Sequence, residues 1–166
     1  MIFQLKKEEF SLTRVLFSML FFMASTKFVI PLYPVPITGQ MIAVYFLGLV
    51  LSPKESFAAV LGWLTFGICG LPVFTAPFGG PTTGYLIGML LGTPAVGILL
   101  KKGFSLVTSC IGAFVIVQLF GCAWLAKFVP LADVIPLGLV PFIIPEALKM
   151  TVVCGILLYR RKANLK

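Results

Sequence analysis

Long uninterrupted runs of apolar residues constrain this chain more than any other feature of its sequence. The last run, 134–159, contains only two charged residues, Glu146 and Lys149, and it exceeds the roughly 20 apolar residues with which a helix crosses a bilayer. Of the 166 residues, 11% are charged, against about 25% in soluble domains. The runs are continuous rather than alternating, which favours helices over membrane strands. We therefore predict a single all-α integral-membrane domain over 1–166.

Six membrane-spanning segments fit the hydropathy pattern. We place them at about 15–32, 37–51, 57–74, 84–100, 104–126 and 134–159. Lys and Arg concentrate on the cytoplasmic side of membrane proteins, so the basic residues test this count. With the N-terminus inside, ten of them fall in the inner segments and two, Lys27 and Lys127, fall outside. The sequence therefore predicts an even number of spans with both termini in the cytoplasm. The inner segments are 1–14, 52–56, 101–103 and 160–166.

Several function classes are disfavoured by the composition. The net charge of +8 does not indicate a nucleic-acid partner, since the basic residues lie at the ends of apolar runs, where they set topology. The chain has no His, and its four Cys show no C-x-x-C spacing, so no metal site or cofactor is expected. A lone Glu without a nucleophile–base arrangement argues against an enzyme.

The two longer outer connections are apolar but contain many residues that oppose helix formation. Segment 30–40 has three prolines, and segment 70–84 is rich in Gly and Pro. Irregular backbone at membrane depth is tolerated only where it is buried in protein or lines a cavity. We therefore expect both segments to cover a pocket that faces outward.

Glu146 and Lys149 are three residues apart and would share one face of a helix. Charges at this depth cost several kcal/mol, so they are retained where they are paired, hydrated or functional. Pro141 and Pro145 precede them, and each removes a backbone hydrogen bond, so we expect a broken span whose regular helix starts near Pro145. Two interpretations stay open. The pair binds a neutral ligand with donor and acceptor groups, such as a urea or amide, or it is a salt bridge that only holds the bundle together.

Other polar and aromatic residues near the outer side admit two interpretations. Phe74, Phe78 and Tyr85 would stack on a flat ligand or anchor the protein at the membrane interface. Gln118, inside the fifth span, is expected to hydrogen-bond to a neighbouring helix. The remaining polar candidates, each of which a cap or loop hydrogen bond would also explain, are Thr38, Gln40, Thr82 and Thr83.

Four motifs occur in order along the chain, and together they resemble the BioY family, the biotin-binding S components of energy-coupling factor (ECF) transporters. The similarity extends over about 12–158. The motifs are Val35-Pro-Ile-Thr-Gly-Gln40, Gly70-Leu-Pro-Val-Phe74, Pro81-Thr-Thr-Gly-Tyr-Leu86 and Glu146-Ala-Leu-Lys149.

The resemblance implies a six-helix S-component fold in the bacterial inner membrane. It implies biotin uptake from a site near the outer face, with one membrane coupling subunit and two ATPase subunits as partners. In that site Glu146 and Lys149 would contact the ureido ring of biotin. The resemblance also implies that the pocket includes Thr38, Gln40, Phe74, Thr82, Gly84 and Tyr85.

This chain departs from the family pattern at two functional features. Glu146 stands where the family usually has Asp. The first span lacks a small-x-x-x-small stripe for docking on the coupling subunit, since Phe22 follows four residues after Ser18. Two alternatives therefore stay open: a solitary biotin facilitator that works without ATPases, and a structural membrane protein in which the Glu–Lys pair is a staple.

Overall fold

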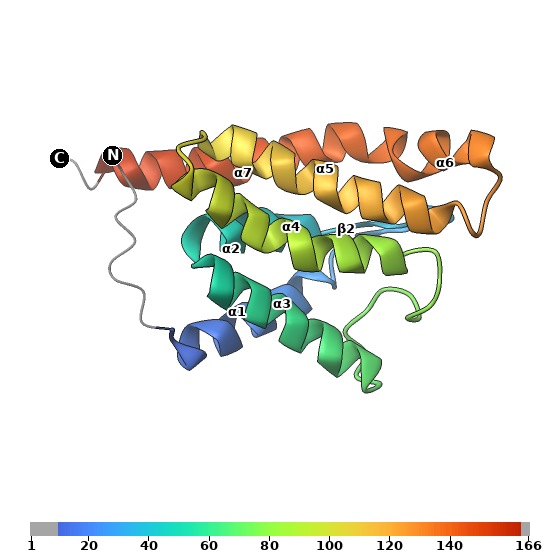
Figure 1. Ribbon diagram of the computed structural model, residues 1–166, viewed down its shortest axis with the longest axis horizontal. Coiled ribbons are helices and arrows are strands. Elements are labelled where there is room, and N and C mark those ends of the chain that lie inside the picture. The colour runs from blue at the N-terminus through green and yellow to red at the C-terminus, as the bar shows by residue number, and fades with distance from the viewer. Residues whose placement is uncertain (1–9, 164–166) are drawn as a thin grey trace.

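The computed structural model describes residues 10–163, which fold into a helical bundle (Figure 1). The three longest helices, α4, α5 and α7, run side by side along the length of the molecule, and α1 and α3 lie together on one side of α4. The start of α1 and the end of α7 lie at the same end (Figure 1). The helices within the described residues are α1 (Leu12–Ser25), α2 (Gln40–Val50), α3 (Pro53–Ile68), α4 (Thr83–Lys101), α5 (Leu106–Leu125), α6 (Leu131–Gly138) and α7 (Val140–Ala163).

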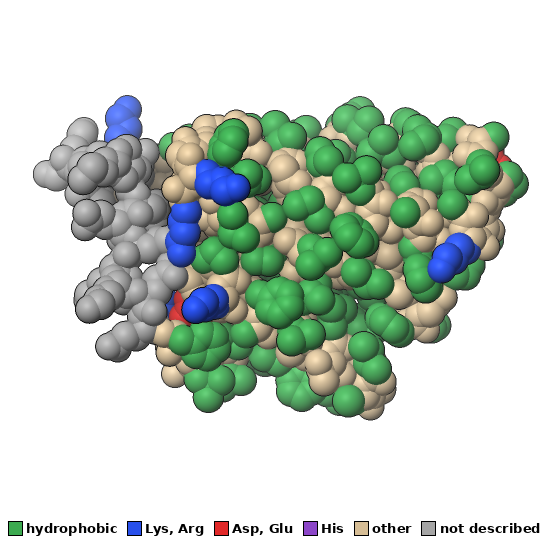
Figure 2. All heavy atoms as spheres, in the orientation of Figure 1, with side chains coloured by type: hydrophobic (Ala, Val, Ile, Leu, Met, Phe, Trp, Pro, Cys, Tyr) green, Lys and Arg blue, Asp and Glu red, His purple; other side chains and the backbone are tan. Residues whose placement is uncertain are grey.

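Among residues 10–163, three stretches are long and apolar enough to cross a membrane: α4, α5 and the stretch Leu131–Arg160 that joins α6 to α7. Two further apolar helices, α1 and α2, are shorter. Figure 2 shows an apolar surface along the length of the molecule and most Lys and Arg side chains gathered at one end. These features describe a multi-pass membrane protein.

The first and third predicted spans end earlier than the hydropathy pattern indicated. Helix α1 ends at Ser25 rather than near residue 32, and the chain then forms an antiparallel hairpin of β1 (Val29–Ile30) and β2 (Ile37–Thr38). Helix α3 ends at Ile68 rather than near residue 74. Both helices are shorter than the predicted spans because hydropathy does not distinguish an apolar helix from an apolar loop. The prolines between the strands lack the N–H that a helix needs.

The sixth predicted span is broken, as expected, but at a different place. The break is at Leu139, between α6 and α7, and Pro145 lies inside α7 rather than at its start. The Tyr85 hydroxyl donates a 2.8 Å hydrogen bond to the carbonyl of Gly138, so a side chain from α4 satisfies a backbone group at the break. A Cβ on Gly138 would lie 2.7 Å from that hydroxyl oxygen, so the close approach requires glycine.

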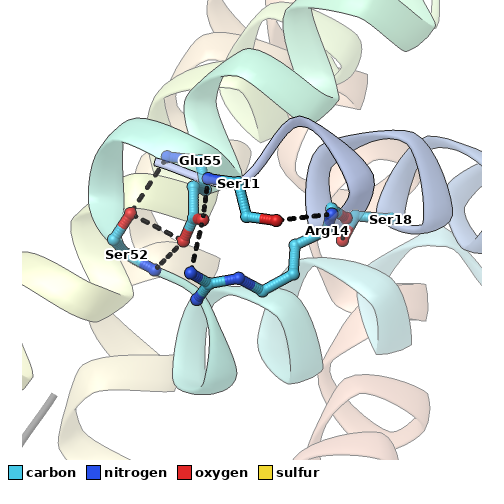
Figure 3. Close-up of polar contacts among 5 residues, drawn as sticks. All are labelled: Ser11, Arg14, Ser18, Ser52 and Glu55. Carbon is cyan, nitrogen blue, oxygen red and sulfur yellow. Dashed lines mark hydrogen bonds and ion pairs between the residues drawn. The ribbon is translucent and has the colours of Figure 1, made fainter. Parts of the chain in front are cut away.

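A buried carboxylate joins α1 to α3 at the end of the bundle where most basic side chains gather. Glu55 is fully buried and accepts hydrogen bonds from the Ser11 N–H at 3.0 Å and the Ser52 hydroxyl at 2.9 Å, with Arg14 Nη2 at 3.3 Å (Figure 3). Burial alone would raise the pKa of the Glu55 carboxyl, but the hydrogen bonds and Arg14 hold that pKa below its ordinary value. Glu55 also completes the capping box that starts α3. The same side chain therefore caps α3 and holds the start of α1 against it.

Candidate functional site

Helix α2 alone spans only part of the bilayer thickness. Its 11 residues rise about 16 Å, roughly half of the 30 Å hydrocarbon core. Its first residue, Gln40, directly follows the β1–β2 hairpin and Gly39. The space that a longer helix would occupy is therefore available for a cavity, with the hairpin beside it.

A cavity of about 40 Å³ is bordered by α2, α4, α5, α7, the hairpin and loop 70–82. One water molecule needs about 10–15 Å³ on this measure, so the cavity has room for a few waters. Much of its wall is apolar, with Met41, Leu86, Met89 and Phe142 among the lining residues. The polar residues that line it are Thr38, Gln40, Thr75, Thr82, Tyr85, Gln118 and Glu146.

Glu146 is the charged residue of this cavity wall, and it is only 2% exposed. Its Oε1 accepts a hydrogen bond from Lys149 Nζ at 2.5 Å, and its Oε2 accepts one from the Tyr45 hydroxyl at 3.0 Å. The predicted adjacency of Glu146 and Lys149 on one helix face is confirmed. Each carboxylate oxygen can accept a further hydrogen bond, so Glu146 still offers acceptor capacity to a bound molecule.

Lys149 is not among the residues that line the cavity. Its ammonium donates to Glu146 and, at 2.7 Å, to the backbone carbonyl of Thr38 in β2. The side chain therefore links α7 to the hairpin. In this arrangement Lys149 neutralises Glu146 and holds the hairpin, while the carboxylate faces the cavity.

Four more of the predicted site residues line the same cavity: Thr38, Gln40, Thr82 and Tyr85. The Thr38 hydroxyl donates a 2.8 Å hydrogen bond to Gln40 Oε1, which fixes the orientation of that amide. The hydroxyl of Tyr85 is already bonded to a backbone carbonyl. Tyr85 therefore offers its ring, whose centroid lies 5.9 Å from that of Phe142.

Two predicted site residues, Gly84 and Phe74, do not line this cavity. A Cβ on Gly84 would overlap Trp124 of α5, so this glycine serves the close packing of α4 on α5. Phe74 packs edge-on against Trp63, with centroids 5.2 Å apart, and borders a separate hollow formed by residues 67–78. Phe74 and Gly84 shape the surroundings of the cavity.

The sequence analysis did not assign Tyr45 or Gln118 to the site. Tyr45 is fully buried and bonds to Glu146; the available signal was a phenol inside an apolar run, which needs a partner when buried. Gln118 was predicted to hydrogen-bond to a neighbouring helix, but its buried Oε1 has no partner among residues 10–163. That prediction was wrong for Oε1, because the side chain lines the cavity instead.

Comparisons with known proteins agree on one family. The model of the BioY family matches residues 3–165. A probable biotin transporter BioY of Pyrococcus horikoshii is 39% identical over 122 residues, covering 70% of this chain and 74% of the relative. The biotin transporter BioY of Thermotoga maritima is 33% identical over 147 residues, covering 82% and 87%.

A crystal structure at 2.1 Å of the S-component for biotin from an ECF-type ABC transporter is similar in fold. It superposes with a TM-score of 0.79 at 28% identity, and the match covers 91% of this chain and 90% of that one. The helical arrangement described above is therefore that of an S component.

Proposed function

Because the chain belongs to the BioY family, we propose that it takes up biotin, as the membrane-embedded component that captures this ligand at the outer face and delivers it inward. The relatives named as biotin transporters and the similar S component support this assignment. The observation in this chain that carries it is a buried carboxylate, Glu146, in the wall of an otherwise largely apolar cavity. An S component works with an ECF energising module, so that module is the proposed partner.

The chemistry of the cavity suits biotin. A cyclic urea offers N–H donors, which a carboxylate accepts, and its fused ring is apolar enough to lie against Met41, Met89 and the rings of Tyr85 and Phe142. At about 40 Å³, the cavity has room for a few waters. We expect the hairpin or loop 70–82, which border it, to move as the ligand enters.

Each predicted site residue has a proposed role. Glu146 accepts hydrogen bonds from the ureido N–H groups, and Tyr85 stacks against the ligand. Lys149 acts as a positioning residue through its bonds to Glu146 and to the hairpin. Thr38, Gln40 and Thr82 contribute polar contacts at the cavity wall, whereas Phe74 and Gly84 set the shape of the surrounding loops and helices.

We propose a single domain of six crossings, with α6 and α7 together forming the sixth and both termini in the cytoplasm of a bacterial cell. The gathering of Lys and Arg at one end supports this orientation (Figure 2). The α4–α5 turn at residues 102–105 and the α5–α6 loop at residues 126–130 would then face opposite sides. Single cysteines placed in each, tested with an impermeant thiol reagent in a background whose native cysteines are replaced, should label from opposite sides. Labelling of both from one side would contradict the topology.

Equilibrium binding of labelled biotin to the purified protein tests the function. We expect saturable binding and a raised melting temperature with biotin. An analogue without the urea should give neither. A chain whose Glu146–Lys149 pair is only a structural staple would show no biotin-dependent stabilisation.

A second candidate, a solitary facilitator, is favoured by the outward face of α1. The exposed residues there are bulky, with Phe17 at 69% and Leu20 at 60% exposure, while Ser18 is buried. This face offers no small-residue stripe for close packing against a coupling subunit. Biotin uptake in cells that lack all coupling subunits would support the facilitator, and uptake only with them would exclude it.

A further inference from the structure

Two buried side-chain amides on the cavity wall each have an atom without a hydrogen-bond partner. Within the described residues, Gln40 Nε2 and Gln118 Oε1 are both buried and unpartnered. Gln40 is 2% exposed at the start of α2, and Gln118 is 7% exposed in α5. Both line the cavity together with Glu146.

The two unpartnered atoms are of opposite kinds. Because Gln40 Oε1 accepts the Thr38 hydroxyl, its Nε2 is left as a donor, and Gln118 Oε1 is an acceptor. Leaving such groups buried and unpaired destabilises a protein. They are therefore better explained by a molecule that enters the cavity than by packing of the ligand-free bundle.

From this we infer that Gln118 is a specificity-determining residue that accepts a hydrogen bond from one ureido N–H of the ligand, while Gln40 donates to the ureido carbonyl. The inference rests on the proposed function and deepens it. Glu146 then accepts from the second ureido N–H. The Gln40 donor and the two acceptors, Gln118 and Glu146, match the one carbonyl and two N–H groups of a urea.

The carboxylate end of the ligand does not fit this place. Its oxygens would face the acceptor oxygens of Gln118 and Glu146, which would repel them. The amides therefore also fix the direction in which the ligand enters. The ureido ring lies at α5 and α7, and the carboxylate chain points away from them.

The experiment measures binding of biotin and of two analogues, each methylated at one ureido nitrogen, to the purified protein and to Gln118→Met. In the native protein, each methylation should weaken binding about tenfold to a hundredfold, because each removes one N–H that a buried acceptor requires. In Gln118→Met, biotin should bind about tenfold to a hundredfold more weakly. In this variant, methylation of the nitrogen that faces residue 118 should not weaken binding any further. This loss of the methylation effect is the coupling that a double-mutant cycle detects.

Stability separates a ligand contact from a packing role. Since Gln118→Met removes a buried unpaired acceptor, the melting temperature of the ligand-free variant should be equal to or above that of the native protein. The matched control is Thr93→Val, which alters a fully buried polar residue of α4 that does not line the cavity. It should leave biotin affinity unchanged.

Three results would overturn the inference. They are unchanged biotin affinity in Gln118→Met, equal methylation costs in both proteins, and a native protein that tolerates methylation at either nitrogen. The last of these needs no variant and therefore holds even if Gln118→Met does not fold. A native protein that binds no biotin at all would instead refute the proposed function.

Discussion

Replacing Lys149 by methionine tests whether the buried charge pair works as the structure indicates. Methionine keeps an unbranched chain of similar length and removes the ammonium. Two hydrogen bonds disappear, one to Glu146 Oε1 at 2.5 Å and one to the Thr38 carbonyl at 2.7 Å. The carboxylate of Glu146, with its side chain 3% exposed, then has no counter-charge from Lys149.

The expected loss in the free energy of unfolding is about 3–5 kcal/mol, the range for breaking a buried ion pair by removing one partner. Protonation of Glu146 limits the part of this loss that comes from the unpaired charge. Neutralising a Glu of ordinary pKa at pH 7 costs roughly 3.7 kcal/mol. The unpaired Thr38 carbonyl adds about 1–3 kcal/mol where water does not reach it. The double variant Glu146→Gln, Lys149→Met removes the uncompensated charge and should recover at least about 2 kcal/mol.

The assay is unfolding by SDS in mixed micelles, followed through the fluorescence of Trp63 and Trp124, with biotin binding measured in parallel. Both the single and the double variant should lose biotin binding. The control is Lys127→Met, which alters an exposed lysine 4.0 Å from the ring centroid of Trp124 and should cost no more than about 1 kcal/mol. A double variant no more stable than Lys149→Met would refute the claim that Lys149 neutralises Glu146. Normal biotin binding by Lys149→Met would refute its role in the site.

Three further changes test other contacts. Tyr45→Phe removes the hydroxyl that donates to Glu146 and should lower the free energy of unfolding by about 1.5–3 kcal/mol; no loss would show that the bond is unimportant. Glu55→Gln should cost about 1–3 kcal/mol at pH 7. Because the pKa of Glu55 is held below 4.5, the difference from the native protein should vanish as the pH falls through that lowered pKa; a difference that persists in acid would contradict this account. Gly84→Val should cost about 1–3 kcal/mol through overlap with α5, whereas Gly155→Ala, with open space around it, should be neutral or stabilising in the same unfolding assay.

Contacts between residues close in sequence could be predicted for this site, whereas contacts between distant residues could not. The spacing of Glu146 and Lys149 predicts one helix face, and their salt bridge confirms it. Tyr45 contacts the same carboxylate from 101 residues away, and no local pattern encodes that distance. For the same reason, spacing does not indicate that the ammonium of Lys149 turns toward the hairpin rather than the cavity.

The boundary between α6 and α7 is determined by a tertiary contact and not by the prolines in the local sequence. Two prolines favoured a helix start near Pro145, but α7 starts at Val140. Proline is acceptable in a first helical turn, so Pro141 does not prevent that start. The break instead lies at Gly138 and Leu139, where the Tyr85 hydroxyl satisfies a carbonyl. This partner comes from another helix and does not appear in the local sequence.

The small volume of the cavity matters for the membrane as well as for the ligand. Proton leakage through a membrane protein requires a continuous file of water between the two aqueous sides. The cavity beside Glu146 has a volume of only about 40 Å³, and buried residues such as Tyr45, Val44 and Val96 form the core of the described bundle. We therefore expect the ligand-free protein to remain in an energised membrane without dissipating the proton gradient.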